Sequence, residues 1–131
     1  MEEEKKMAEK IIVIKSKNLN ENLRKNLVEY YCFFNDYQCV LELEVNNLEK
    51  ELKSILKILH KRNISKLVFL DFCDFGDDTI ILDILEKLSL KGIEIEIILQ
   101  NIKTKKSTLT EVLNAISNYH CLNDLEVLGN V

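Results

Sequence analysis

Short apolar segments alternate along this chain with longer segments of helical periodicity. Strands are expected at residues 10–15, 38–45, 67–70 and 93–99. Each is followed by a segment in which apolar residues recur every three or four positions, as on one face of a helix. A βαβαβαβα order requires a mostly parallel sheet with helices on its faces, joined by right-handed crossovers. We therefore predict an α/β fold, a three-layer α/β/α domain whose mostly parallel sheet has four to five strands.

Apolar spacing and capping residues place the helices. The first is expected over residues 20–34, and Asn46 with Glu49 and Thr108 with Glu111 form capping pairs that begin the second and the last. The residues expected to face the core are Leu23, Leu27, Tyr31 and Phe34 in the first helix, Leu48, Leu52, Ile55, Leu56 and Leu59 in the second, Ile81, Ile84, Leu85 and Leu88 in the third, and Leu109, Val112, Leu113 and Ile116 in the last.

Length and charge limit the class of protein. A chain of 131 residues is long enough for one hydrophobic core and too short for two. Residues 1–10 are expected to be a charged lead and residues 11–131 the domain. The lead is too charged for a secretory signal and no apolar run approaches a membrane span, so we expect a cytoplasmic protein with no membrane partner. The net charge is −4 with basic and acidic residues interspersed, so no basic tract favours nucleic acid.

Cysteine and histidine positions do not predict a metal site or a cofactor. The cysteines are Cys32, Cys39, Cys73 and Cys121. They have no CxxC spacing and are not grouped with His60 or His120, so neither zinc ligation nor a redox pair is indicated. Reduced, mostly buried thiols are the simplest interpretation. The few glycines form no phosphate-binding loop.

An acidic loop follows the third expected strand. Asp71, Asp74, Asp77 and Asp78 lie within eight residues, and no basic residue occurs between residues 66 and 87. In open α/β sheets, sites commonly occur where a strand's carboxyl end leads into a helix. Three interpretations stay open: carboxylates that cap the helix beginning near Asp78, a magnesium site, or a surface for a partner.

Two short motifs lie at the ends of the first and third expected strands. IIVIKS ends with Ser16, and CDFGDDT occupies residues 73–79. Together with GIEIEIILQNIKT at residues 92–104 and the last helix, they resemble the catalytic domain of the serine recombinases, the resolvase and invertase family. The resemblance covers residues 10–119. It implies a resolvase-like fold and dimer contacts through the last helix.

The same motifs depart from the family at residues that carry its chemistry. The family's Y-x-R-V-S has its nucleophilic serine at Ser16 and an arginine where this chain has Ile14. In the family's D-R-L-[SG]-R-[ND]-T, Cys73 takes the aspartate position, and Asp74 and Asp77 take both arginine positions. Arginines there stabilise charge developing on the phosphoryl oxygens, whereas carboxylates repel it. The resemblance therefore implies a protein related to site-specific DNA recombination that does not cleave DNA.

Two alternative functions stay open. A fragment of an active serine recombinase would use Ser16 as the nucleophile for DNA strand cleavage and exchange. A STAS-like regulatory domain, of the anti-sigma factor antagonist kind, has the signature F-x-D-S-[ST]-G, and residues 75–80 are similar with Asp78 at the phosphoserine position. The early long helix argues against a STAS domain, because STAS domains open with strands that pair first.

Protein association is the function that these observations favour. By resemblance to the family's dimerisation helix, we expect a homodimer or another protein partner to contact the last helix at Leu109, Val112, Leu113 and Ile116. DNA as a partner follows from the family alone and is not supported by the charge.

Overall fold

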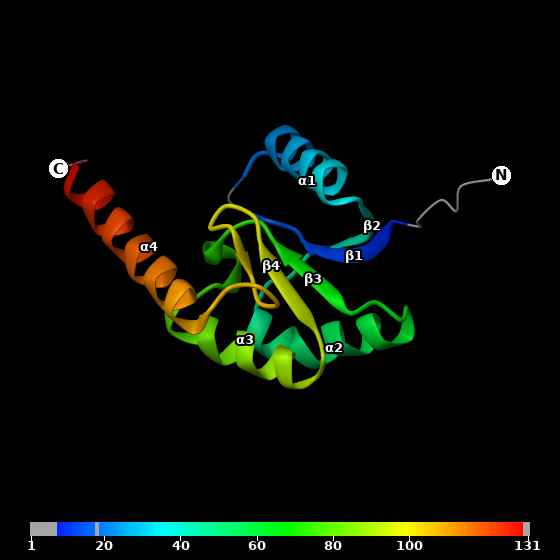
Figure 1. The fold of residues 1–131 in the computed structure, drawn as a ribbon. Helices are drawn as coiled ribbons and strands as arrows, with labels where there is room; N and C mark the ends of the chain where they lie inside the picture. Colours follow the sequence, from blue (N-terminus) through cyan, green and yellow to red (C-terminus); the bar gives the residue numbers. More distant parts are fainter. Residues whose placement is uncertain (1–7, 18, 130–131) are drawn as a thin grey trace.

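The computed structural model describes residues 8–17 and 19–129 (Figure 1). The chain forms, in order, β1 (Glu9–Ile14), α1 (Glu21–Asn35), β2 (Tyr37–Leu43), α2 (Leu48–Lys61), β3 (Lys66–Phe69), the 3₁₀ turns η1 (Phe72–Phe75) and η2 (Asp78–Ile80), α3 (Ile81–Leu90), β4 (Glu94–Ile97), β5 (Ile102–Lys103) and α4 (Leu109–Gly129). The strand β1 begins within the expected charged lead, and residues 1–7 of that lead lie outside the described part.

One mostly parallel sheet organises the fold, in the order β2-β1-β3-β4-β5. β1 pairs in parallel with β2 and β3, and β3 with β4. The short β5 is antiparallel to β4 and pairs Ile102 with Ile97. The predicted α/β class and mostly parallel sheet are confirmed, and β2 lies at the sheet edge, as its alternating sequence indicates.

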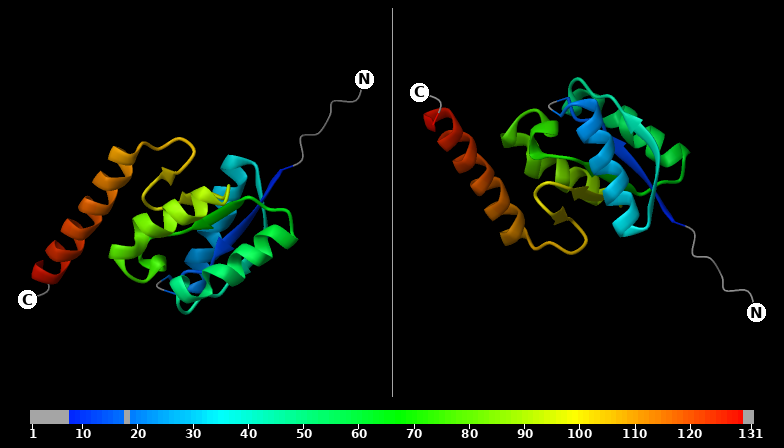
Figure 2. Two further views of the ribbon diagram at one scale, coloured as in Figure 1. Left: turned by 90° about the horizontal axis from the view of Figure 1, so that it is seen from below. Right: turned by 90° about the horizontal axis from the view of Figure 1, so that it is seen from above.

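Helices cover both faces of the sheet, which fits the predicted three layers. α1 lies alone on one face, while α2 and α3 lie on the other (Figures 1 and 2). Alternate residues of β1 serve the two faces: Ile12 and Ile14 belong to the larger core under α2 and α3, and Ile11 and Val13 to the smaller core under α1. α4 packs its first turns on the larger core through Val112.

α1 buries only part of the predicted face, since Leu27 and Tyr31 pack against the smaller core as predicted. Leu23 and Phe34 are exposed, whereas Arg24 and Val28 are buried. Arg24 takes an inner position because its guanidinium pairs with the Glu42 carboxylate of β2. The apolar spacing could not indicate this rotation, since the pairing joins a helix residue to a distant strand.

The cap of α2 lies one residue later than predicted. Asn47 adopts an extended backbone, and its side chain accepts a hydrogen bond from the Lys50 N–H at 3.1 Å. Glu51, not Glu49, reaches back and accepts from the N–H groups of Asn46 and Asn47 at 2.8 and 2.7 Å. Asn46 is therefore not the cap, because the side chain that accepts the free N–H of the first turn is that of Asn47. The predicted buried faces of α2 and α3 are confirmed, with Leu56 half-buried.

Three cysteines are more exposed than predicted. Cys32, Cys39 and Cys73 are half-buried rather than buried, and the side chain of Cys121 lies outside the described part. Burial raises the pKa of Cys32 and raises that of Cys39 to about 11, so both thiols are protonated at neutral pH.

Among the described helices, none is long and apolar enough to cross a membrane.

Candidate functional site

A pocket of about 390 Å³ lies at the carboxyl ends of the first three strands. Because β1, β2 and β3 are parallel, the segments that follow them meet at one edge of the sheet. Residues after β1, residues before α2 and the acidic loop between β3 and α3 all line this pocket. Its polar lining includes Lys15, Lys17, Asn46, Glu49, Cys73 and Asp74.

Ser16, the residue at the family's nucleophile position, is buried at this edge. Its side chain is only 3% exposed, and its hydroxyl forms no hydrogen bond of standard geometry with the described residues. The hydroxyl nevertheless lies near enough to the Asp74 carboxylate to lower the pKa of that group. The structure thus places Ser16 beside a carboxylate and beneath the surface.

The carboxylates of the acidic loop hold the loop itself together. Asp74 Oδ2 accepts from the Asp71 N–H at 3.1 Å, and Asp77 Oδ1 accepts from the Thr79 N–H at 3.0 Å, which caps η2. Gln100 Nε2, from the segment after β4, donates to Asp71 Oδ1 at 2.6 Å. Capping of turns therefore accounts for three of the four aspartates.

Two buried rings anchor the loop to the core. Phe75 stacks on Phe69 of β3 with ring centroids 4.2 Å apart, and Phe72 meets Tyr119 of α4 edge to face at 5.6 Å. Between the two turns Gly76 has φ +92°, a conformation that residues with a side chain rarely adopt. The loop is thus a defined structure rather than a loosely solvated segment.

Asp74 carries the clearest electrostatic signal of the site. Burial raises the pKa of Asp74, and the adjacent Asp71 charge adds to this, while the Ser16 hydroxyl and the Asp71 N–H partly oppose the rise. A carboxylate whose charged form is already penalised favours neither a phosphate nor any other anion at the same place.

The altered family positions come together around this pocket. Ile14, Cys73, Asp74 and Asp77 all line it, although Ile14 points into the core and Asp77 lies at the exposed rim. Cys73 Sγ donates to Asp71 Oδ2 at 3.1 Å. The four altered positions therefore share one pocket, and the sequence gave no sign that Asp74 folds inward toward Ser16.

Arginine is absent from the lining of this pocket. The chain's arginines are Arg24 and Arg62. Arg24 is buried and paired with Glu42, and Arg62 follows the last turn of α2. Within residues 8–17 and 19–129, no group of three or more His, Cys, Asp or Glu side chains is placed to hold a metal ion.

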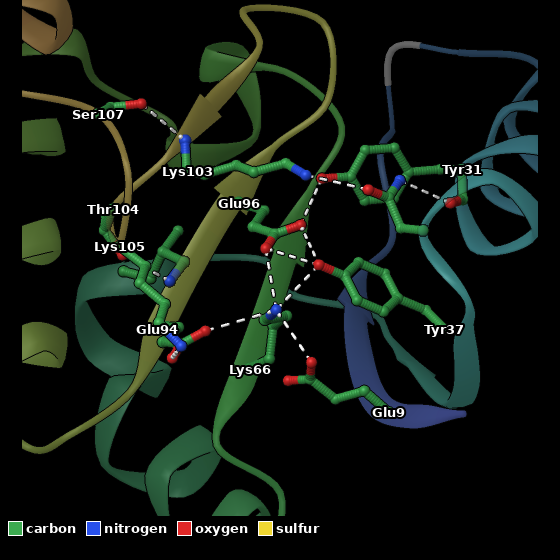
Figure 3. A network of polar contacts seen from close by, with 12 residues as sticks. Glu9, Tyr31, Tyr37, Lys66, Glu94, Glu96, Lys103, Thr104, Lys105 and Ser107 are labelled. Atoms are coloured by element: carbon green, nitrogen blue, oxygen red, sulfur yellow. Dashed lines mark hydrogen bonds and ion pairs between the residues drawn. The ribbon is translucent and has the colours of Figure 1, made fainter. Parts of the chain in front are cut away.

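A second polar cluster, which the sequence did not predict, lies at the amino ends of the strands, opposite to the first pocket (Figure 3). The buried amine of Lys66 donates to the Tyr37 hydroxyl at 2.9 Å and pairs with the carboxylates of Glu9, Glu94 and Glu96 at 3.2, 3.4 and 3.0 Å. Glu96 is also buried and accepts from the Tyr37 hydroxyl at 2.8 Å. These contacts join the first residues of β1, β2, β3 and β4.

The same cluster attaches α1 to the sheet. Tyr31 of α1 donates its hydroxyl to Glu96, and Lys103 of β5 donates to Asn35 at 2.9 Å. Burial would raise the pKa of Glu96, but hydrogen bonds from Tyr31, Tyr37 and Lys66 outweigh it and lower that pKa. Alternation of glutamate with isoleucine in β4 is the sequence signal that could have pointed to an inward carboxylate.

Comparison with known proteins gives no further assignment. No protein-family model matches this sequence, and no curated protein matches it significantly. The resemblance to the serine recombinases therefore stays a prediction from the motifs.

Proposed function

We propose that this chain is a resolvase-like domain that does not cleave DNA and acts by associating with a second copy of itself through α4. The observation that carries this proposal is the position of α4, which leaves the body of the domain (Figures 1 and 2). Its C-terminal half lies clear of the other described elements in every view. Isolated helices shorter than about 12–15 residues are marginal in water, so a partner would stabilise this half.

The exposed side chains at the start of α4 support the same proposal. Leu109 is 69% and Leu113 is 44% exposed. An apolar pair on one helix face is suited to packing against a second helix. Val112 does not belong to the contact surface, because it is buried in the chain's own core, and Ile116 is half-buried against that core. The proposed surface is therefore narrower than the four residues expected from the sequence.

The geometry around Ser16 supports the absence of strand cleavage. An attacking hydroxyl must reach the phosphorus atom, and cations must lie where negative charge develops. Ser16 is buried, its neighbour is the Asp74 carboxylate, and the pocket has no arginine in its lining. Lys17 lies at the rim, where its amine donates to Asn46. These features argue against the alternative of an active recombinase fragment.

The element order argues against the STAS alternative. A long helix, α1, follows β1 directly, and β1 then pairs with β2 in parallel. STAS domains would instead open with strands that pair before any long helix. Asp78, at the position of the STAS phosphoserine, begins the short turn η2.

Two leucine substitutions test the association. We expect light scattering to give a dimer mass for the unmodified chain and a monomer mass for Leu109→Glu/Leu113→Glu, because two carboxylates cannot be buried at a helix interface. Leu90→Glu is the matched control, since Leu90 on α3 is 79% exposed and lies away from α4; it should remain a dimer. A thermal melt checks that the variants are folded. A dimer that survives the double substitution would remove α4 from the interface.

A further inference from the structure

A second pocket, of about 530 Å³, lies where α2 and α3 end. It lies on the sheet face that these helices cover. It is at the amino ends of β3 and β4, whereas Ser16 follows the carboxyl end of β1. The turn after α2 and the turn after α3 form its walls. Its volume is within the range of pockets that hold small molecules, about 300–1,000 Å³.

The lining of this pocket has an apolar floor and a basic rim. The half-buried Leu56 and Ile93 form the accessible floor, above the buried Leu59 and Ile64. Lys57, His60 and Lys91 are exposed at the rim, and no Asp or Glu belongs to the lining. In the described part of the chain, no carboxylate lies within ion-pair distance of these three side chains. A net charge of −4 for the whole chain makes such a purely basic rim a local exception.

Hydrogen-bonded turns close both helix ends beside the pocket. The ends of α2 and α3 turn through residues of positive φ, Asn63 at +55° and Gly92 at +77°. The N–H of Ile64 bonds to the Leu59 carbonyl at 2.9 Å, and the N–H of Ile93 bonds to the Leu88 carbonyl at 3.0 Å. Each turn satisfies a carbonyl near its helix end.

We propose that this pocket binds a small amphipathic anion, with an apolar body on Leu56 and Ile93 and an anionic group at Lys57 and Lys91. Binding removes the apolar surface of the ligand from water. The two lysine amines attract the anionic group and so set the orientation of the ligand. The lysines also complement the negative ends of the two helix dipoles, a role that by itself requires no ligand. This inference does not depend on association through α4.

The dye 8-anilinonaphthalene-1-sulfonate tests the proposal, because it joins an aromatic body to one sulfonate. We expect its fluorescence to report saturable binding to the full chain, and Lys57→Gln/Lys91→Gln to weaken that binding about fivefold. Lys25→Gln/Lys106→Gln is the matched control, since it removes the same charge at exposed lysines outside the pocket. The control should bind the dye as the unmodified chain does.

A neutral dye separates recognition of charge from recognition of shape. N-phenyl-1-naphthylamine has the same aromatic body without the sulfonate, and we expect the Lys57→Gln/Lys91→Gln variant to bind it as tightly as the unmodified chain does. Three results would overturn the proposal: unchanged sulfonate binding in that variant, an equal loss of both dyes, or an equal effect of the control variant. Thermal melts of both variants show whether they remain folded.

Discussion

Lys66→Met is expected to lower the free energy of unfolding by about 3–5 kcal/mol, the usual cost of removing one member of a buried ion cluster. The substitution leaves Glu96 buried without its cation, and Glu9 and Glu94 lose the same partner. Urea denaturation measures the effect. Lys87→Met is the matched control, because Lys87 pairs with Asp83 in an exposed i,i+4 pair, whose loss should cost far less than that of the buried cluster.

The pH dependence of this loss has a defined sign. The pKa of Glu96 is lowered in the folded state, so its stabilising contribution is present above its ordinary pKa and is lost as the pH falls through the folded value. Without Lys66, Glu96 is destabilising while charged and is relieved by protonation. The difference between the variant and the unmodified chain should therefore be largest near neutral pH and shrink in acid. Equal costs for Lys66→Met and Lys87→Met would contradict the cluster.

Phe75→Ala should cost about 3–5 kcal/mol, as is typical when a buried aromatic ring is removed from a core. Phe75 is 1% exposed and stacks on Phe69, so its removal leaves a cavity beneath the acidic loop. Phe33→Ala is the matched control, because Phe33 on α1 is 80% exposed and its loss should change stability by about 0.5 kcal/mol or less. Urea denaturation gives both values. Similar costs at the two positions would mean that the loop is not anchored as described.

The sequence predicted the elements whose apolar residues face one way. α2 and α3 were placed correctly because Leu52, Ile55, Ile84 and Leu88 form one-sided stripes with polar residues around them. α1 was rotated from its prediction because it carries apolar residues on both sides, and Phe34 faces away from the core.

Buried charges could not be predicted from local patterns. The partners of Lys66 include Glu9 and Glu96, which are distant in the sequence and meet only when β1, β3 and β4 align. β5 is two residues long, too short to show any periodicity. Such pairing between distant residues is determined by the order and register of the strands in the sheet.

The sequence singled out the acidic loop that lines the pocket, but not the contacts within that loop. The sequence marked the acidic loop at the carboxyl end of a strand, whereas its meeting with Ser16 follows from the parallel pairing of β1 with β3. The inward turn of Asp74 depends on the Asp71 N–H and on the two anchoring phenylalanines, which a motif comparison does not reveal.

The light-scattering mass of the unmodified chain, measured with and without a short DNA duplex at low and at high salt, tests the central claim most directly. We predict a dimer mass that the duplex leaves unchanged at both salt concentrations, because the pocket beside Ser16 has no arginine in its lining and the chain is negatively charged. A monomer mass would contradict association. A larger mass with DNA at low salt that disappears at high salt would show phosphate-backbone binding and contradict the account.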